Sequence, residues 1–225
     1  MIDKQTLNIV PTPIGNLEDI TFRSIQTLKN SDYILCEDTR VSKKLLLKYD
    51  IEVPLVSFHS FNEHKTVNKH VNQILSGKKI SLISDAGTPS ISDPGFLIVR
   101  ESIKKGIEIN CLPGPTALIP ALVNSGLSSE RFVFEGFIPS KKGRTKRMKN
   151  FKEESRSIIL YESPKRLIRL LNELQELIGG DRKISISREI SKLYQENLRG
   201  TISELISQLD NKVIKGEIVV IIDGK

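Results

Sequence analysis

Short apolar runs alternate with longer amphipathic runs along the whole chain, and this alternation restricts the fold more than any other feature of the sequence. The apolar runs have the length of strands and the amphipathic runs have the length of helices. This order is typical of α/β proteins with largely parallel sheets, whose strands are covered on both faces. We predict strands over Leu7–Val10, Tyr33–Cys36, Leu55–Phe58, Ile80–Ile83, Ile107–Leu112, Phe132–Phe134, Ile158–Tyr161, Ile184–Ile186 and Ile218–Ile222.

Two of the intervening helices are marked by the residues at their ends. Ser163 and Pro164 have the pattern of an N-cap followed by a first-turn proline, and Gly179 ends the periodic apolar run that follows them. Thr201 and Glu204 have the spacing of a capping box ahead of a second apolar run. Both segments are therefore predicted to be helical.

A proline-glycine-proline sequence at 113–115 interrupts any regular element and suggests a domain boundary. We predict an N-terminal α/β domain over 1–114 with a parallel sheet, and a C-terminal α/β domain over 115–225. Apolar residues alternate in Phe132–Phe134 and in Ile184–Ile186, which is typical of a sheet with one wetter face. The second sheet is therefore expected to be mixed.

The positive charge of the chain is concentrated in one segment. Thirty-four Lys and Arg against 27 Asp and Glu give a net charge of +7, and Lys141–Lys152 contains seven positive residues and no acid. A patch of this density suits a polyanion such as nucleic acid, whose binding is dominated by phosphate contacts. From charge alone, a solvated helix face is an equally good interpretation. The seven residues are Lys141, Lys142, Arg144, Lys146, Arg147, Lys149 and Lys152.

Several classes of protein are disfavoured. No run approaches the roughly 18 apolar residues of a membrane span, and Met1–Asn8 lacks the apolar core of a secretory signal, so we expect a cytoplasmic protein. Cys36 and Cys111 lie in apolar runs, which favours buried free thiols over a disulfide. The three histidines have no recognised metal spacing, so no metal is expected. Walker and Gly-x-Gly-x-x-Gly fingerprints are also missing.

Three loops that follow predicted strands are unusual. Pro11–Asn16 is a stiff turn, Glu37–Arg40 carries two acids and an arginine, and Ser84–Gly95 is long and rich in small residues. Ligands of parallel sheets bind beyond the carboxyl ends of the strands, so all three loops are expected along one edge. Each loop also has a structural interpretation: a plain turn, a cap of the next helix by Glu37, and Asp93 as N-cap before a first-turn proline.

Eight short motifs run in order through the chain. They are Val10–Asp19, Glu37–Arg40, Ser84–Gly95, Pro113–Ala117 with Ser125–Leu127, Glu135–Pro139, Tyr161–Leu167, Arg188–Glu189 and Lys215–Val219. As a set they resemble the tetrapyrrole (corrin/porphyrin) methylase superfamily, in its branch of ribosomal RNA ribose 2′-O-methyltransferases. The resemblance implies two α/β domains with S-adenosylmethionine (SAM) in the cleft between them, and a homodimer. It also implies metal-free methyl transfer to a cytidine ribose in the decoding region of small-subunit (16S) rRNA, with the rRNA inside a 30S-like particle.

The resemblance also implies roles for individual residues. An acid among Glu37, Asp38 and Asp85 would take the hydroxyl proton, with Asp38 as our first choice and Arg40 orienting phosphate or ribose. RNA contacts are expected from Lys141, Lys142, Arg144, Lys146, Arg147 and Lys149. Cofactor contacts are expected from Pro13, Gly15, Asp85, Ala86, Gly87, Thr88, Ile91, Thr116, Ala117, Tyr161, Glu162 and Gly216.

Two alternative functions remain open at this point. A tetrapyrrole C-methyltransferase would use the same fold but gives no obvious use for the basic segment. A non-catalytic RNA-binding module would not need the three strand-end loops, and aromatic residues make up only 5% of the chain. Many members of the resembling branch continue into a C-terminal helical extension, whereas this sequence ends at Lys225. RNA docking is therefore expected to depend more on the basic segment, or on a partly assembled ribosomal subunit as the substrate.

Overall fold

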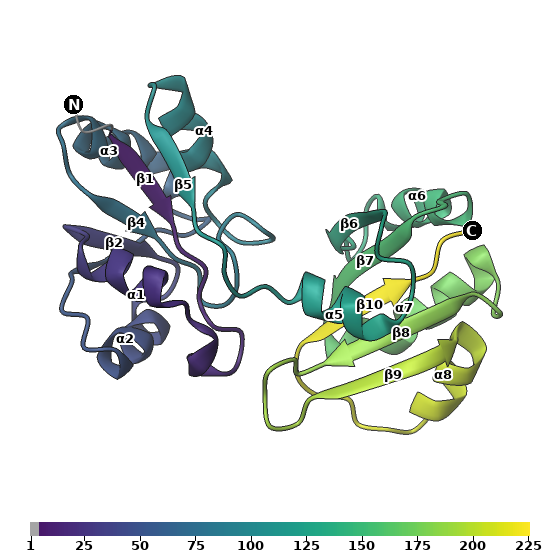
Figure 1. Ribbon diagram of the computed structural model, residues 1–225. Coiled ribbons are helices and arrows are strands. Elements are labelled where there is room, and N and C mark those ends of the chain that lie inside the picture. Colours follow the sequence, from purple (N-terminus) through teal and green to yellow (C-terminus); the bar gives the residue numbers. More distant parts are fainter. Residues whose placement is uncertain (1–4) are drawn as a thin grey trace. The chain divides into compact units, whose positions relative to one another are not determined.

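The computed structural model describes residues 5–225, and the chain divides into two compact units, Met1–Thr116 and Ala117–Lys225. Each unit contains one five-stranded sheet (Figure 1). Residues 1–4, half of the polar segment Met1–Asn8 considered above, lie outside the described residues. None of the described helices is both long and apolar enough to cross a bilayer.

The sheet of the first unit is entirely parallel, with strand order β3-β2-β4-β1-β5. This confirms the predicted parallel sheet. All five strands coincide with predicted apolar runs to within a residue or so at each end. Their bounds are β1 (Thr6–Ile9), β2 (Tyr33–Cys36), β3 (Leu55–Ser57), β4 (Ile80–Leu82) and β5 (Glu108–Cys111).

Helices cover both faces of this sheet and create two separate cores (Figure 1). Leu28 and Leu45 of α1 and α2 pack on one face with Ile34, and Val71 and Ile98 of α3 and α4 pack on the other. Burial on two faces explains why the strands are apolar without alternation. The helices are η1 (Leu17–Asp19), α1 (Phe22–Lys29), α2 (Thr39–Lys48), α3 (Glu63–Leu75) and α4 (Phe96–Lys104).

The sheet of the second unit is mixed, as predicted. Its order is β6-β7-β10-β8-β9; β6 and β7 are parallel, and the other neighbouring pairs are antiparallel. The strands are β6 (Phe132–Phe137), β7 (Ser157–Glu162), β8 (Lys183–Arg188), β9 (Glu196–Thr201) and β10 (Ile218–Ile222). Strand β9 was not predicted, because it lies at the sheet edge and its sequence, ENLRGT, is largely polar.

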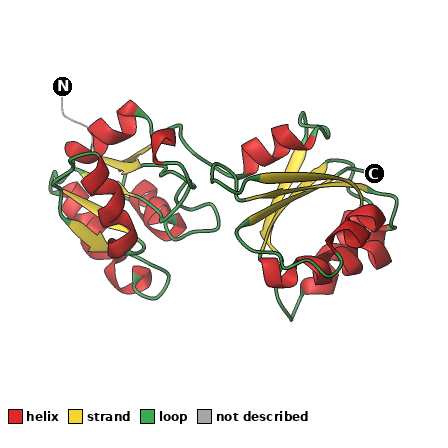
Figure 2. Cartoon of the chain, turned by 90° about the horizontal axis from the view of Figure 1, so that it is seen from below, coloured by secondary structure: helices red, strands yellow, loops and turns green. Residues whose placement is uncertain are grey.

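The second sheet lies between α5 on one face and α7 and α8 on the other (Figure 2). Leu170 and Leu174 of α7 pack with Leu205 of α8 over Leu160 and Val220 of the sheet. The helical elements of this unit are α5 (Leu118–Ser125), α6 (Arg144–Lys149), η2 (Asn150–Lys152), α7 (Pro164–Ile178) and α8 (Ile202–Leu209).

The predicted helix boundaries of the second unit are confirmed. Ser163 is the N-cap of α7, Pro164 is in its first turn, and Gly179 is its C-cap. At α8, the Thr201 hydroxyl accepts from the Glu204 amide at 3.2 Å, and the Glu204 carboxylate accepts from the Thr201 amide at 2.8 Å. The reciprocal pair satisfies two amides that the helix itself leaves without partners.

Two expectations were wrong. Helix α4 starts at Phe96 with Gly95 as N-cap, so Asp93 does not cap it. Gly95 has a φ of 136°, and the turn it makes separates the Asp93–Pro94 pair from the helix. Cys36 and Cys111 are both free, but Cys111 is exposed, because β5 is an edge strand whereas β2 lies inside the sheet.

Candidate functional site

Four loops leave the first sheet at the same edge, as the sequence predicts for three of them. Because β1 pairs in parallel with β4 and β5, and β2 pairs in parallel with β4, the carboxyl ends of these strands are neighbours. The fourth loop is the exit from β5, at 112–116. We call this surface the loop edge.

The loops after β1 and β4 are joined through their backbones. The Thr12 amide donates to the Gly87 carbonyl, and the Gly87 amide donates to the Thr12 carbonyl, both at 2.9 Å. The Thr12 hydroxyl also donates to the Ser84 carbonyl at 2.9 Å, in a buried position. These bonds close a small antiparallel bridge that holds the two loops together.

The exit from β5 packs on the same group of loops. A Cβ added at Gly114 would lie only 2.8 Å from Cβ of Pro11, so glycine is required for this close approach. The Thr88 hydroxyl donates to the Pro115 carbonyl at 3.2 Å. The β5 exit is therefore fixed against the loops that follow β1 and β4.

The loop after β4 has a strained backbone. Ser90 and Ser92 have φ values of 74° and 65°, in the left-handed region that favours glycine, and Gly87 and Gly95 also have positive φ. The Ser90 hydroxyl is buried and has no hydrogen-bond partner among the described residues. Strain of this kind persists only where the surroundings impose it, and it is concentrated at ligand sites. The prolines and glycines of this loop are visible in the sequence, but the positive φ of the two serines is not.

Asp38 has a structural role at the start of α2. Its carboxylate accepts from the Arg40 amide at 2.8 Å, which makes it the N-cap. It also forms an ion pair with the Arg40 guanidinium, with 2.6 Å between Oδ2 and Nη2. The guanidinium hydrogen bonds hold the pKa of Asp38 well below its usual range, at about 2. The cap considered for Glu37 therefore belongs to Asp38.

The other two acids of the loop edge have the opposite electrostatic character. Partial burial raises the pKa of Glu37, and the negative charge of Asp85 raises it further. Partial burial also raises the pKa of Asp85, although its carboxylate accepts from the Asp38 amide at 3.0 Å. A raised pKa is typical of carboxylates that exchange protons near neutral pH.

The structure brings together part of the predicted cofactor set and distributes the rest over the second unit. The members of the first unit lie on the loops just described. In the second unit, Tyr161 packs edge-on against the rings of Phe134 and Phe137, with centroids 5.0 and 5.7 Å apart. Gly216 has a φ of 92°, and a Cβ there would collide with the Glu189 side chain. The members of the first unit are Pro13, Gly15, Asp85, Ala86, Gly87, Thr88, Ile91 and Thr116.

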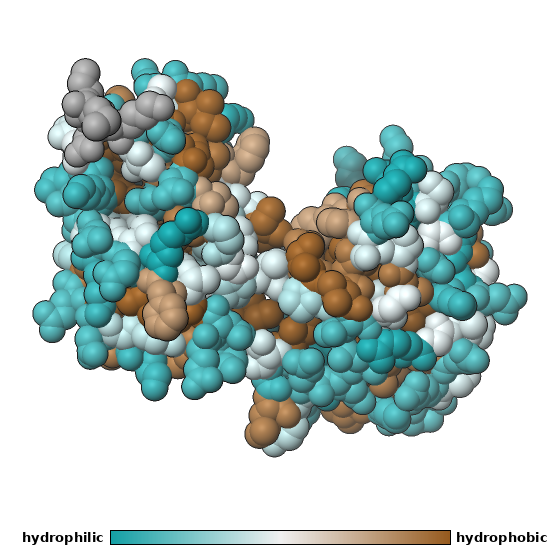
Figure 3. Space-filling view, viewed as in Figure 1, coloured by the Kyte–Doolittle hydropathy of each residue, from teal (hydrophilic) through white to brown (hydrophobic). Residues whose placement is uncertain are grey.

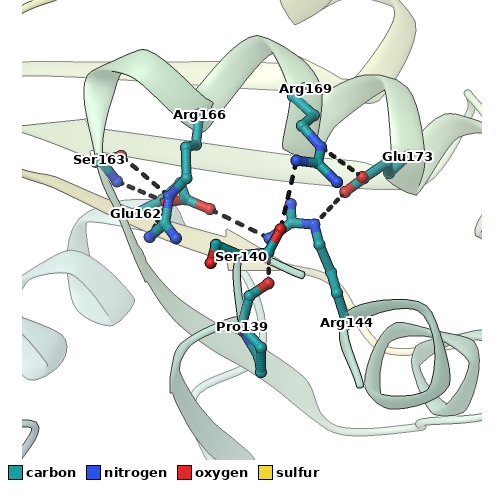
Figure 4. A network of polar contacts seen from close by, with 8 residues as sticks. All are labelled: Pro139, Ser140, Arg144, Glu162, Ser163, Arg166, Arg169 and Glu173. Atoms are coloured by element: carbon teal, nitrogen blue, oxygen red, sulfur yellow. Dashed lines mark hydrogen bonds and ion pairs between the residues drawn. The ribbon is translucent and has the colours of Figure 1, made fainter. Parts of the chain in front are cut away.

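The prediction that Arg144 is available for RNA is wrong. Its guanidinium is buried, only 3% exposed, because it turns inward onto α7 and donates from Nε to the Glu173 carboxylate at 2.6 Å (Figure 4). Arg147 is half-exposed but engaged, donating to the carboxylate of Glu135 at 2.5 Å and to its carbonyl at 2.7 Å. The lysines of the segment are exposed: Lys141, Lys142, Lys146, Lys149 and Lys152.

Glu162 lies in the same buried network. Its Oε1 accepts from the Ser163 amide and forms an ion pair with Arg166, both at 2.7 Å. Sequence reasoning missed Arg166 and Glu173 as members of a site. Their i,i+4 spacing from Glu162 and Arg169 was the available signal, but such spacing is common on solvated helices. Within residues 5–225, no three His, Cys, Asp or Glu side chains are grouped so that they could hold a metal ion.

A two-sheet α/β chain with candidate ligand-binding loops at one sheet edge is a class of protein that can be matched to a family by sequence. Residues 6–206 match the family model of the Tetrapyrrole (Corrin/Porphyrin) Methylases. The chain therefore belongs to the tetrapyrrole (corrin/porphyrin) methylase family.

Within this family the chain is similar to proteins named Ribosomal RNA small subunit methyltransferase I. It is 48% identical to the one from Thermotoga maritima, over 97% of this chain and 98% of that protein. It is 46% identical to the one from Halalkalibacterium halodurans and 45% identical to the one from Bacillus subtilis. These two matches cover 99% of this chain and 77% and 76% of the relatives.

Solved structures show the same fold at low sequence identity. Diphthine synthase superimposes with a TM-score of 0.75 at 12% identity, covering 97% of this chain and 90% of that one. A uroporphyrin-III-C-methyltransferase from Thermus thermophilus gives a TM-score of 0.66 at 14% identity, covering 97% and 94%. At this identity the likeness bears on the fold alone.

Proposed function

We propose that the protein is a SAM-dependent methyltransferase that modifies a cytidine ribose 2′-hydroxyl in the decoding region of small-subunit (16S) rRNA. The observation that carries this proposal is the 45–48% sequence identity, over nearly the whole chain, to proteins named Ribosomal RNA small subunit methyltransferase I. The loop edge supports the cofactor part of the proposal, and the exposed lysines support the RNA part. A substrate in a 30S-like particle implies a cytoplasmic location.

The loop edge fits SAM. Adenine and a methionine chain require apolar walls, backbone hydrogen-bonding groups and small residues that permit close approach. The backbone of Gly87 is buried and bonded to Thr12, so in this loop the fit rests on the small side chains and the other backbone groups. The Ser90 hydroxyl is a buried polar group that still lacks a partner within the described residues.

We assign SAM contacts in the first unit to the eight residues named above. For the second unit we propose contacts through the backbone, because the Glu162 carboxylate is already engaged by Ser163 and Arg166. The proposed backbone contacts are Ala117, Tyr161, Glu162 and Gly216.

The chain must align the ribose hydroxyl and accept its proton, while bound SAM supplies an electrophilic methyl group on a sulfonium sulfur. A base is effective when its pKa lies near the working pH, and a positioned base contributes roughly 10²–10⁴-fold in rate. The pKa of Asp38, at about 2, makes it a weak base, whereas the pKa values of Glu37 and Asp85 are raised. We therefore assign the proton to Glu37 or Asp85, and give Asp38 and Arg40 the role of positioning ribose or phosphate.

Exposed lysines of the second unit form the proposed RNA surface. We omit Arg144 and Arg147 from the RNA contacts, because the Arg144 guanidinium is buried and the half-exposed Arg147 guanidinium is bonded to Glu135. Lysine offers phosphate a mobile point charge, and binding by such contacts weakens steeply with salt. We retain Lys141, Lys142, Lys146 and Lys149 as RNA contacts.

Methyl transfer in vitro tests the function directly. Unmethylated small ribosomal subunits, purified protein and SAM with a labelled methyl group are combined, and the rRNA is digested to nucleosides for mass spectrometry. We expect label in 2′-O-methylcytidine, placed in the decoding region by reverse-transcription mapping. Label on a base, or no transfer to subunits or free rRNA, would overturn the proposal. If no methyl transfer is seen, calorimetry with SAM distinguishes an inactive methyltransferase from a non-catalytic RNA-binding module, because the latter would bind no SAM.

The proposed homodimer is tested on the same preparation. Light scattering should give twice the chain mass of 25.3 kDa. A monomer at the concentrations used in the methylation assay would remove the dimer from the proposal without affecting the reaction assigned to the chain.

A further inference from the structure

The segment Lys141–Lys152 contains two kinds of positive side chain that a count of charges does not distinguish. Its two arginines, Arg144 and Arg147, are bonded to carboxylates and carbonyls of the second unit. Its lysines are exposed, and Figure 3 shows hydrophilic side chains over this part of the unit. We call the lysines of this segment the lysine face.

Arg144 is held from three sides (Figure 4). Its Nε donates to Glu173 at 2.6 Å, its Nη1 donates to the Pro139 carbonyl at 3.2 Å, and Nη1 lies 3.9 Å from Oε2 of Glu162. These partners come from α7, from the loop that follows β6 and from the end of β7. A single side chain therefore links the start of the basic segment to the rigid core of its own unit.

The partners of Arg144 are themselves fixed. Glu173 also accepts from Arg169 at 2.8 Å, and Arg169 reaches the Ser140 carbonyl at 3.5 Å. Glu162 is fully buried and paired with Arg166. The planar guanidinium can serve several acceptors in one orientation, whereas a lysine ammonium is a compact point charge on a flexible chain. The network therefore requires arginine at position 144.

The hydrogen bonding of this network is incomplete within the described residues. Nη2 of Arg144 and Oε2 of Glu162 are buried and have no hydrogen-bond partner among the described residues. A buried ion pair of this kind adds little net stability but can select one conformation, because each charge is costly in any arrangement that leaves it unpaired. This favours a role in fixing geometry.

We propose that Arg144, through Glu173 and Glu162, is a positioning residue that fixes the lysine face for the phosphates of its RNA substrate. The inference rests on the proposed function, because it takes RNA as the partner of this surface. A fixed backbone lowers the ordering entropy that the lysines lose when they bind phosphate. Arg144 itself contacts no phosphate.

A positioning role for Arg144 and a purely electrostatic surface predict opposite effects of Glu173→Gln on RNA affinity. Glu173→Gln removes a negative charge near the lysine face, so a purely electrostatic surface would bind RNA more tightly. If the carboxylate instead holds Arg144 in place, Glu173→Gln weakens RNA binding. Glu176→Gln is the matched control, because it removes the same charge from an exposed position on the same helix that no described contact connects to Arg144.

The experiment measures dissociation constants for a small-subunit rRNA transcript at several salt concentrations, with SAM affinity as the check on folding. We expect Glu173→Gln to weaken RNA binding about tenfold with an unchanged salt slope, because ordering is lost and no phosphate contact is removed. Lys146→Met should reduce the salt slope by about 1, as expected for a lost phosphate contact. Glu176→Gln should bind RNA at least as tightly as the wild type.

Two outcomes overturn the inference. One is tighter or unchanged RNA binding by Glu173→Gln. The other is a salt slope that falls for Arg144→Met as it does for Lys146→Met, while Arg144→Lys keeps the wild-type slope. That result would mean that Arg144 contacts phosphate. Failure of the wild-type protein to bind the transcript in a salt-dependent manner would instead contradict the proposed function.

Discussion

Two strand-to-helix junctions of this protein each pair an acid with an arginine a few residues later, but the two acids differ in burial. At the β2–α2 junction an acid is followed two residues later by arginine, as Asp38 and Arg40, and the pair is open to solvent. At the β7–α7 junction an acid is followed four residues later by arginine, as Glu162 and Arg166, and the acid is fully buried. The difference comes from a third element, since Arg144 of α6 extends to Glu162, with 3.9 Å between Nη1 and Oε2.

The comparison shows that an acid and an arginine at a strand end do not by themselves define a chemical site. At β2 the neighbouring loops leave Glu37 and Asp85 partly exposed, with raised pKa values. At β7 the acid is buried between two arginines, Arg144 and Arg166, and has a structural role. Each prediction below tests one side of this contrast.

The largest expected effect is on the rate at the loop edge. We expect Glu37→Gln or Asp85→Asn to lower single-turnover methylation by roughly 10²–10⁴-fold, because the variant that carries the base loses its proton acceptor. Asp38→Asn should lower the single-turnover rate much less. SAM titration controls for binding. A wild-type rate in both Glu37→Gln and Asp85→Asn would remove these acids from the mechanism, and a large loss in Asp38→Asn alone would restore Asp38.

The next effect is on stability at the buried junction. Arg144→Met should lower the free energy of unfolding of the second unit by about 3–5 kcal/mol, because Glu173 and Glu162 lose a buried partner. Arg40→Met should leave it nearly unchanged, since the Arg40 side chain is 87% exposed. Denaturant unfolding measures both variants. Equal losses of unfolding free energy in Arg144→Met and Arg40→Met would mean that burial does not explain the difference between the two junctions.

A smaller effect is expected from the backbone of the loop edge. Gly95→Ala should destabilise the first unit by about 1–3 kcal/mol, because positive φ is strained for alanine. An added Cβ would also lie 2.5 Å from the Ser90 hydroxyl and 2.8 Å from Leu82. Gly77→Ala is the control, since Gly77 has a positive φ of 94° with no atom within 4 Å. In thermal unfolding, we expect Gly77→Ala to lower the stability of the first unit clearly less than Gly95→Ala does.

The smallest effect is a pair of opposite pH dependences within one loop. The pKa of Glu37 is raised by folding, so its charged form destabilises the folded state as pH rises above the unfolded value, and Glu37→Gln should stabilise the protein at neutral pH. The pKa of Asp38 is lowered, so its contribution is present above about pH 4 and disappears towards pH 2. Asp38→Asn should therefore destabilise at neutral pH and be indistinguishable from the wild type near pH 2. Unfolding curves across pH would contradict this if both variants shifted in the same direction.

Much of the fold was predictable because it depends on local patterns. Strand β10 and helix α7 are apolar or amphipathic along their whole length, and α7 and α8 have capping residues at their starts. Strand β9 was not predictable in this way, because an edge strand needs only a partner for its backbone and ENLRGT has no apolar period. Its partner β8 is what defines it.

The loop edge was predictable in outline, because the ends of parallel strands converge. The roles of individual side chains were not. Sequence does not show that Asp38 folds back on its own helix, or that Arg144 turns inward while Lys146 on the same short helix turns outward. Such choices depend on what packs against each face, and a run of like charges contains no information about that.

The reciprocal bonds between Thr12 and Gly87 have a consequence for deuterium exchange. Both amides belong to loops, yet each donates to the other residue's carbonyl. They should exchange as slowly as amides within a strand even in the free protein, whereas neighbouring loop amides exchange freely. A ligand arriving at this edge would then find two loops that are already one ordered unit, and the appearance of new protected amides would mark the positions that it orders itself.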